Sequence, residues 1–375
     1  MESRKISLCI CGGGGLGTVI AGIAASNGYD VNILTSRPSE WEYSVTVLDK
    51  NGRKYNGTLN KISANPAEVI SESDIVLFCL PGSVINDELI KIKSFLRKGA
   101  VVGSVFSCTG FFIMAIAQLG ENVRLFGFQR VPFIARVKEY GHTALLLDYR
   151  KSLNVAFWGV TNPDELRQQL EGILITPINV LEHVLQVTLT NSNPILHPSR
   201  LYSMLKNYHQ SQSFETVPYF YRDWTNESSQ TLIDCDAEFQ KMLSHLGLQS
   251  SVTPPLLEYY ESWDASSLTR KIASIESLKE LRVPMIKSDS GGYIPDWNNR
   301  YFIEDISYGM MLIKFICQER GIETPHIDQI ITWFQEKIGK SYMIDNRLLY
   351  NQDTKEIACL NFEVIQKLFK TLRRQ

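Results

Sequence analysis

Residues 5–17 read KISLCICGGGGLG, a short apolar run followed directly by five glycines in six positions. The run Lys5–Cys11 predicts a buried β-strand, and the small and branched residues of Leu16–Asn27 predict the helix that follows it. A strand that turns tightly into a helix through glycines is typical of the first unit of a dinucleotide-binding sheet.

The glycines of this turn fall in the pattern G-x-G-x-x-G at Gly12, Gly14 and Gly17. Glycine permits a tight turn and has no Cβ atom to collide with a pyrophosphate, and a helix N-terminus offers unpaired N–H groups to it. We therefore expect Gly12, Gly14, Gly15, Leu16 and Gly17 to bind a dinucleotide. A glycine-rich loop that holds no ligand is the alternative interpretation.

The chain alternates short β-rich runs with helical segments from Lys5 to about Leu181. This pattern predicts a doubly wound, mostly parallel α/β sheet, a Rossmann domain over residues 1–182. Further strands are predicted at Val31–Thr35, Asp74–Leu80, Ala100–Ser104, Val123–Phe128, Ala144–Leu147 and Asn154–Val160, and a hairpin at Tyr43–Leu59 turns at Lys50-Asn51-Gly52.

After about His183 the apolar residues recur at three- and four-residue spacing, which predicts an all-α domain over residues 183–375. The clearest helical segments are Leu232–Leu246, Ser267–Leu281, Ile306–Glu319 and Phe362–Leu372. This domain is expected to bind the substrate and to carry the catalytic groups.

The bulk composition excludes several classes of protein. With 38 basic and 40 acidic side chains, the chain gives no electrostatic reason to expect nucleic acid or an anionic membrane as a partner. No run approaches the roughly 18 apolar residues that span a bilayer. The seven cysteines lack zinc-site spacing, so we expect no metal and a reducing, cytoplasmic setting. The helical domain could bury the interface of a homodimer.

The end of the second predicted strand bears on the choice of cofactor. An NAD enzyme usually has an acidic residue there, whereas this strand ends in Thr35-Ser36-Arg37. Two hydroxyls and a guanidinium suit a 2′-phosphate, so the sequence favours NADP, with NAD as the alternative. Leu80 and Pro81 follow a later strand at the edge where the cofactor would pass, although a simple strand-ending turn also fits them.

Two segments of the second domain contain candidate catalytic residues. His197 stands in Asn191-Ser192-Asn193-Pro194-Ile195-Leu196-His197-Pro198, and the flanking prolines predict that it is held in a rigid loop. Asp305 precedes a predicted helix, where it would act as the N-cap or orient an imidazole through the second ring nitrogen. A histidine near neutral pH can supply the proton that reduction of a carbonyl or imine requires.

These segments resemble those of the octopine/nopaline (opine) dehydrogenase family, and the resemblance covers nearly the whole chain. The motifs that carry it are Asn193-Pro194-x-x-His197 and Arg300-x-x-x-Glu304-Asp305-Ile306-x-Tyr308-Gly309, with a looser match at Arg136-Val137-x-x-Tyr140-Gly141. The resemblance implies an enzyme that condenses a 2-oxo acid with an amino acid and reduces the resulting imine with NAD(P)H.

The resemblance also implies residue roles. His197 would be the acid/base, Asp305 its partner, and Arg300 and Arg136 would bind the substrate. A structural histidine, a helix cap and two surface arginines are the alternatives. Two other functions also fit a dinucleotide domain joined to a helical one: an NADP-dependent 2-oxo acid reductase of the ketopantoate reductase or 6-phosphogluconate dehydrogenase type, and an NADP-binding sensor without turnover. The first usually relies on a lysine, and no lysine here has a comparably marked position.

Overall fold

The computed structural model describes residues 5–248, 251–289 and 291–372. The chain divides into two compact units. Unit 1 runs to Thr188 and includes Gln366–Leu368, and unit 2 comprises Leu189–Ile365 and the residues from Phe369 on. The boundary predicted from the sequence, between residues 182 and 183, lies shortly before this division.

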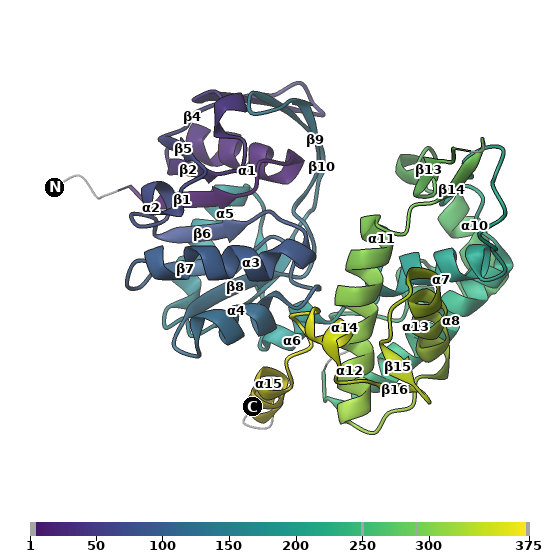
Figure 1. The fold of residues 1–375 in the computed structure, drawn as a ribbon. Helices are drawn as coiled ribbons and strands as arrows, with labels where there is room; N and C mark the ends of the chain where they lie inside the picture. The colour runs from purple at the N-terminus through teal and green to yellow at the C-terminus, as the bar shows by residue number, and fades with distance from the viewer. Residues whose placement is uncertain (1–4, 249–250, 290, 373–375) are drawn as a thin grey trace. The chain divides into compact units, whose positions relative to one another are not determined.

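The main sheet of unit 1 has eight strands in the order β12-β11-β8-β7-β6-β1-β2-β5 (Figure 1). They are β1 (Ser7–Cys11), β2 (Asp30–Leu34), β5 (Lys61–Ser63), β6 (Ile75–Phe78), β7 (Val101–Ser104), β8 (Arg124–Phe128), β11 (Leu153–Trp158) and β12 (Ile178–Val180). All neighbours pair in parallel except β11 with β8. The order from β5 to β8 is that of a dinucleotide-binding sheet, so the predicted Rossmann fold is confirmed.

A second sheet of unit 1 has the order β4-β3-β10-β9. Its strands are β3 (Ser44–Asp49), β4 (Lys54–Thr58), β9 (Phe133–Glu139) and β10 (Thr143–Tyr149). The predicted hairpin is confirmed by the β3–β4 pairing, with Gly52 at φ +82° in its turn. The sequence did not predict β9, because it buries Phe133 but leaves most of its other side chains exposed.

The glycine turn leads into helix α1 (Gly15–Ser26), which packs against β1 and β2 of the main sheet and against all four strands of the second sheet. Its residues from Gly17 to Ala24 are all buried. Burial between two sheets accounts for a helix of small and branched residues, since a larger side chain would hold the layers apart. The turn is thereby fixed at the carboxyl edge of the main sheet.

The other helices of unit 1 are α2 (Pro66–Val69), α3 (Gly82–Ile92), α4 (Phe111–Leu119), α5 (Pro163–Leu174) and α6 (Val184–Thr188). Helix α5 packs against α1, and α3 packs against α4. The core includes the fully buried rings of Phe126 and Phe128 on β8. Each such ring contributes roughly 1.5–3 kcal/mol through removal from water.

Unit 2 is mainly helical, as predicted (Figure 1). Helix α7 (Asn193–Leu205) packs against α8 (Asn226–His245), α13 (Pro325–Ile338) and the π-helix η4 (Ile303–Met310). Helix η4 follows α11 (Arg300–Phe302) and continues into α12 (Met311–Glu319). The other α-helices are α9 (Leu256–Tyr259), α10 (Ala265–Ala273) and α14 (Gln352–Lys355), of which α10 ends earlier than the predicted segment Ser267–Leu281. Helix α15 (Phe362–Leu372) has residues in both units.

Two short antiparallel ladders in unit 2 were not predicted. One pairs β13 (Met285–Lys287) with β14 (Tyr293–Pro295), and the other pairs β15 (Met343–Ile344) with β16 (Arg347–Leu348). Strands of two or three residues are too short to show an alternating pattern in the sequence. They join helices and leave the helical character of the unit unchanged.

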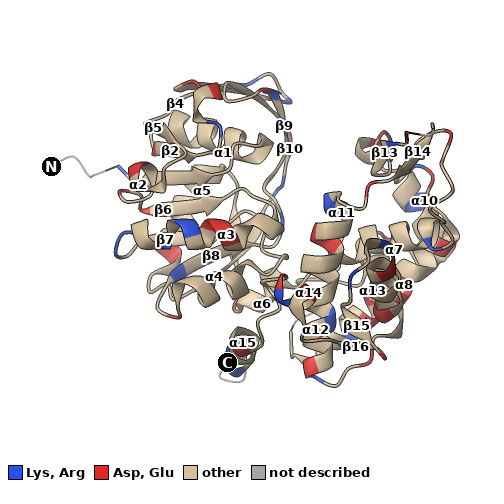
Figure 2. Cartoon of the chain, viewed as in Figure 1, with Lys and Arg blue, Asp and Glu red and all other residues tan. Residues whose placement is uncertain are grey.

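Basic and acidic residues are interspersed in both units (Figure 2). Among the described residues, none of the helices has both the length and the apolar character that crossing a bilayer requires.

Candidate functional site

The glycine turn of unit 1 is close-packed on one side and open on the other. Gly12 has φ +112°, and a Cβ atom on it would lie 2.8 Å from the carbonyl oxygen of Cys79. A Cβ atom on Gly17 would collide with the carbonyl oxygen of Gly12, so the turn and α1 approach each other closely. Gly14, the N-cap of α1, has nothing within 4 Å of its Cβ position and supplies no capping side chain. The open side at a helix N-terminus suits a phosphate group.

A cavity of about 290 Å³ extends from this turn. Its lining comprises Gly12, Gly13, Gly14, Leu34, Thr35, Ser36, Arg37, Leu80, Glu88, Lys91 and Tyr140. Six of the residues that the sequence proposed for the cofactor therefore line one cavity: Gly12, Gly14, Thr35, Ser36, Arg37 and Leu80. The other four proposed residues, Gly15, Leu16, Gly17 and Pro81, belong to the neighbouring helix starts and do not line it.

Arg37 is anchored at the end of β2 by two contacts. Its guanidinium lies 3.7 Å from the ring centroid of Tyr140 and donates a hydrogen bond of 3.2 Å to Glu40. The Tyr140 hydroxyl lies 3.2 Å from the hydroxyl of Thr35. Burial opposes ionisation of Tyr140, but the Thr35 hydrogen bond and the Arg37 charge outweigh it and lower the pKa. The result is a polar, cationic corner beside the glycine turn.

Tyr140, Glu88 and Lys91 are lining residues that the sequence reasoning did not assign to the cofactor. Glu88 and Lys91 lie on α3 with 3.6 Å between carboxylate and ammonium. They line the cavity because of the face that α3 turns toward it, and no sequence motif predicts which face that is. Tyr140 stood in the looser match that included Arg136, so that motif was the available signal.

Arg136 lies on β9 in unit 1, with its side chain exposed. Its guanidinium donates a 3.0 Å hydrogen bond to the carbonyl oxygen of the adjacent Ala135. The backbone at this point packs on the glycine turn, since a Cβ atom on Gly15 would lie 3.1 Å from the Ala135 carbonyl. Within unit 1, Arg136 is therefore near the start of α1.

His197 lies on helix α7 of unit 2, so the predicted rigid loop is wrong. The helix begins with Pro194 in its first turn, where the missing N–H is not needed, and it continues through Pro198. Pro198 removes one backbone hydrogen bond from the helix interior. Burial of every residue from Pro194 to Leu201 compensates for that loss.

The imidazole of His197 is paired with the carboxylate of Asp305. The Nδ1 atom lies 2.7 Å from Asp305 Oδ2, and both side chains are less than 10% exposed. Asp305 lies inside the π-helix η4, while Asn299 caps the preceding α11, so the N-cap role considered for Asp305 is wrong. A carboxylate accepts only, so Nδ1 carries the proton and Nε2 is the nitrogen left to exchange one.

A close approach of η4 to α7 allows this pair to form. A Cβ atom on Gly309 would lie 2.7 Å from Cβ and 2.9 Å from Cγ of Pro194. The rigid proline ring cannot turn away, so only glycine permits this separation. The two motifs of the sequence thus contact each other twice, through Pro194–Gly309 and through His197–Asp305.

Aromatic side chains surround the imidazole of His197. The ring of Tyr301 stacks on it at 4.1 Å between centroids, and that of Phe220 contacts it edge-on at 5.3 Å. The Tyr221 hydroxyl lies 2.8 Å from His197 Nε2. Burial is the main factor that raises the pKa of Tyr221, which therefore stays protonated. Water is thus largely excluded from the pair, which strengthens its electrostatic interaction.

Arg200 holds Tyr221 and its neighbours against α7. One turn after His197, its guanidinium donates to the carbonyl oxygens of Phe220 at 3.1 Å and Asp223 at 2.7 Å. It also donates to the Ser228 hydroxyl at 3.0 Å. Burial lowers the pKa of Arg200 to about 10. Tyr221 stands in the aromatic-rich stretch Tyr202–Trp224, for which the sequence suggests either a wall of the amino-donor pocket or a packing surface. The sequence did not assign Tyr221 or Arg200 to the acid–base pair, because the contacts join a helix to a loop about twenty residues away.

Arg300 begins α11 and has an exposed side chain. Its guanidinium lies 5.4 Å from the ring centroid of Tyr301, the ring that stacks on His197. Within the described part of the chain, no carboxylate forms an ion pair with it. His197 and Asp305 are thus brought together in unit 2, and the exposed cation of Arg300 lies beside Tyr301, whose ring stacks on the imidazole.

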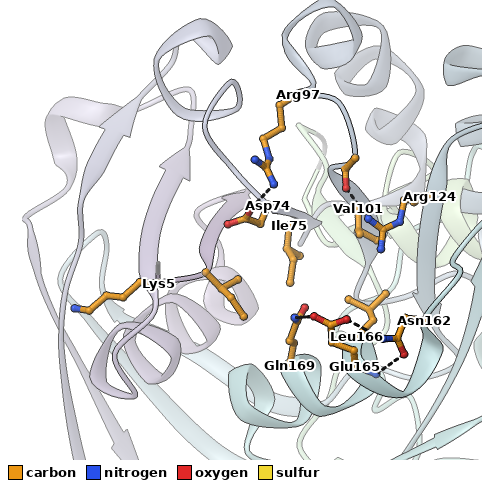
Figure 3. Close-up of a pocket in the computed structure, with 12 residues that line it drawn as sticks. Lys5, Asp74, Ile75, Arg97, Val101, Arg124, Asn162, Glu165, Leu166 and Gln169 are labelled. Carbon is orange, nitrogen blue, oxygen red and sulfur yellow. Dashed lines mark hydrogen bonds and ion pairs between the residues drawn. The ribbon is translucent and has the colours of Figure 1, made fainter. Parts of the chain in front are cut away.

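A different cavity of unit 1, of about 320 Å³, lies at the amino edge of the main sheet (Figure 3). Lys5, Asp74, Arg97, Arg124 and Glu165 provide its charges. Arg97 forms an ion pair with Asp74, and Arg124 donates to the carbonyl oxygen of Gly99. These groups stabilise strand ends, and the cavity lies at the edge opposite to the glycine turn. It provides no buried acid–base pair.

The chain is similar to known proteins over nearly its whole length. Residues 180–338 match the family model described as "NAD/NADP octopine/nopaline dehydrogenase, alpha-helical domain". The chain is 28% identical to octopine dehydrogenase of Mizuhopecten yessoensis, with 92% of each chain covered. It is 27% identical to tauropine dehydrogenase of Arabella iricolor, with 91% of this chain and 94% of the relative covered.

The fold of the chain is similar to a solved structure of octopine dehydrogenase with NADH and L-arginine. The TM-score is 0.85, with 24% sequence identity over 99% of this chain and 98% of the other. The Rossmann sheet, the helical unit and these matches define an NAD(P)-dependent oxidoreductase that acts on CH–NH bonds. The chain is thus similar to the octopine/nopaline (opine) dehydrogenase family over nearly its whole length.

Proposed function

We propose that the protein joins a 2-oxo acid to the amino group of an amino acid and reduces the resulting imine to a secondary amine. The observation that carries this proposal is the buried His197–Asp305 pair, with the exposed cation of Arg300 beside the aromatic ring that stacks on His197. An acid/base must take a proton from the attacking ammonium group and give one to the departing oxygen. A cation beside it would hold the substrate carboxylate.

Each residue has one role in this proposal. His197 exchanges protons through Nε2, and Asp305 orients the ring and stabilises the imidazolium. Arg300 binds the carboxylate of the 2-oxo acid, and Arg136 contributes a second cation for the substrates. Removal of one such general acid–base group typically lowers the rate by about 10²–10⁴-fold.

We propose that unit 1 binds NADP through the glycine turn and the cavity beside it. The nicotinamide cofactor supplies the hydride for the imine carbon. Gly12, Gly14, Gly15, Leu16 and Gly17 would hold the pyrophosphate at the start of α1.

The adenosine end of the cofactor would lie along the rest of the cavity, with Leu80 and Pro81 beside it. Arg37, with Thr35 and Ser36, would hold the 2′-phosphate at the end of β2. The Arg37 guanidinium lies over the Tyr140 ring and its side chain is exposed, so that it is accessible to a phosphate group. This accessibility supports the assignment. Its pair with Glu40 leaves NAD as the other candidate, because a carboxylate could accept from the ribose hydroxyl.

An NADP-dependent 2-oxo acid reductase is the competing function, and it would rely on a catalytic lysine. Lys314, a buried lysine of unit 2, lies 2.7 Å from Asp328 and 3.1 Å from the Thr324 hydroxyl. Its ammonium group is thus engaged in contacts that join α12 to α13. This pairing favours the condensation reaction with its histidine–aspartate pair.

The test is an assay of cofactor oxidation by the purified protein. NADPH or NADH would be combined with pyruvate or 2-oxoglutarate and with L-arginine, L-alanine and other amino acids in turn. Oxidation that requires both organic substrates supports the proposal. Oxidation with the oxo acid alone supports the simple reductase, and cofactor binding without turnover in every combination supports a sensor.

We further propose a cytoplasmic enzyme that forms a homodimer through unit 2. The scattered cysteines, all of which are free thiols, support a reducing compartment. Analytical ultracentrifugation of the full chain tests the assembly, and a single species at the monomer mass would overturn it.

A further inference from the structure

Tyr221 occupies the only ring nitrogen through which His197 can exchange protons with a substrate. Asp305 holds Nδ1 at 2.7 Å, and the Tyr221 hydroxyl lies 2.8 Å from Nε2. In the neutral imidazole Nε2 is an acceptor, so Tyr221 O–H donates to it. A substrate oxygen must therefore either displace this hydroxyl or receive its proton through it.

The surroundings of Tyr221 oppose its displacement. Its side chain is only 6% exposed, and its ring stacks on Trp224 at 6.2 Å and contacts Phe220 edge-on at 5.0 Å. Arg200 ties the main chain on both sides of it, at Phe220 and Asp223, to the helix that carries His197. A side chain fixed at both its ring and its backbone is preorganised to stay in place.

The positive charge of Arg300 relates the Tyr221 hydroxyl to the proposed binding site of the substrate carboxylate. Arg300, the proposed carboxylate anchor, acts on Tyr221 electrostatically, and Tyr301 links Arg300 to the imidazole. The hydroxyl is thus hydrogen-bonded to the proton-exchanging nitrogen and lies within electrostatic range of the cation that would hold a 2-oxo acid. A reacting oxygen next to that carboxylate would be near the Tyr221 hydroxyl.

We infer that Tyr221 is a catalytic residue that carries protons between His197 Nε2 and the substrate. This inference rests on the proposed function. The ammonium group of the amino acid gives one proton to the Tyr221 oxygen as the tyrosine O–H proton moves to Nε2. The neutral amine then attacks the oxo carbon, and one of the two protons left on its nitrogen passes to the former carbonyl oxygen, which becomes a hydroxyl.

The same relay runs in reverse for the loss of water. The imidazolium N–H gives its proton to the Tyr221 oxygen while the tyrosine O–H proton moves to the substrate hydroxyl. The C–O bond breaks, water leaves, and the nitrogen lone pair forms the C=N bond. Tyr221 and His197 end as they began, so no external acid is required. Because burial raises the pKa of Tyr221, the two transfers are concerted and no tyrosinate accumulates.

The test compares Tyr221→Phe with wild type and with Tyr219→Phe. Tyr219 lies two residues earlier, its ring is between the guanidiniums of Arg222 and Arg282, and within the described residues its hydroxyl has no hydrogen bond. Steady-state rates would be measured with NAD(P)H, the 2-oxo acid and the amino acid. Cofactor affinity and the thermal midpoint would show whether each variant is folded.

The relay predicts that Tyr221→Phe lowers kcat by about 100-fold or more, the scale of a lost general acid. The KM of each organic substrate and the cofactor Kd should change less than threefold, and Tyr219→Phe should match wild type. A Tyr221→Phe kcat equal to or above that of wild type, with lower KM values, would mean that the hydroxyl only covers Nε2, and it would overturn the relay.

The outcome for the wild type separates this inference from the proposed function. Wild-type oxidation of the cofactor by the oxo acid alone would overturn the condensation reaction, while a large loss of kcat in Tyr221→Phe would still support proton delivery to the oxygen. Turnover that needs both substrates, unchanged in Tyr221→Phe, would overturn the relay alone. A wild type without turnover in any combination would overturn both.

Discussion

Asp305 Oδ2 and His197 Nδ1 lie 2.7 Å apart although 108 residues separate them in the sequence. Helix α7 and the π-helix η4 position the pair, and the Pro194–Gly309 contact sets how closely the two helices pack. Helices with π geometry are frequent at functional sites. The arrangement makes one imidazole nitrogen a fixed donor and the other the proton-exchanging atom.

Replacement of Asp305 by Asn should lower kcat by about 10²–10⁴-fold. The amide can keep the ring in place, but it carries no charge to stabilise the imidazolium and permits the wrong tautomer. The KM values and the cofactor Kd should stay near wild type, as measured by steady-state kinetics and cofactor fluorescence. A variant with full kcat would show that the carboxylate has only a structural role.

Replacement of Gly309 by Ala should reduce both stability and turnover. In a helix this change normally stabilises by up to about 1 kcal/mol, but here the new methyl would lie 2.7 Å from Pro194 Cβ. Overpacking of this kind typically costs about 1–3 kcal/mol. We expect a lower thermal midpoint and a lower kcat, because η4 must move away from α7. A higher midpoint with unchanged kcat would contradict this account of the packing.

Replacement of Arg37 by Ala should weaken NADPH binding by roughly 10- to 100-fold, since a hydrogen bond to a charged group contributes about 1.5–3 kcal/mol. The affinity for NADH should change less than threefold, because only the 2′-phosphate is proposed to contact this guanidinium. Fluorescence titration with each cofactor gives the ratio of the NADPH and NADH dissociation constants. An unchanged ratio would assign the chain to NAD, with Glu40 as the group for the ribose.

The stability of unit 1 should decrease as the pH falls from 6.5 to 4. Burial lowers the pKa of His183 to about 4, and its Nδ1 accepts from the backbone N–H of Leu185. Between these values the unfolded chain binds a proton that the folded chain does not, so protonation favours unfolding. Over the whole range the free energy of unfolding should fall by about 3 kcal/mol, since one pKa unit corresponds to about 1.4 kcal/mol.

Calorimetry of wild type and His183→Asn checks this prediction. Asparagine can accept the same backbone hydrogen bond but does not titrate in this range. The midpoint of wild type should fall more steeply between pH 7 and pH 5 than that of the variant. Parallel pH profiles would show that His183 is not the responsible group.

The sequence predicted the features that depend on local patterns. The glycine turn, the β3–β4 hairpin and the alternation of the Rossmann sheet each have a signal within about twenty residues. His197 and Asp305 were correctly paired with each other, but their local structure was wrong. Pro198 predicts a break in the chain, whereas the buried surface of α7 outweighs the one hydrogen bond that the proline removes.

Tyr221 and Arg200 could not be found from the sequence for a different reason. Their roles depend on a loop that packs across a helix, and neither stands in a repeated spacing or a turn motif. Lys91 lines the cofactor cavity only because of the rotational phase of α3. Such contacts are set by tertiary packing and become visible only in the structure.

The most direct test of the central claim is the rate of cofactor oxidation by His197→Ala with both organic substrates at saturation. His209→Ala, a change of the same type at an exposed site, is the matched control. The acid–base role of His197 predicts that kcat falls by at least 100-fold while the cofactor Kd and the thermal midpoint remain those of the control. A His197→Ala enzyme that turns over at the control rate, or that loses cofactor binding in equal measure, would contradict it.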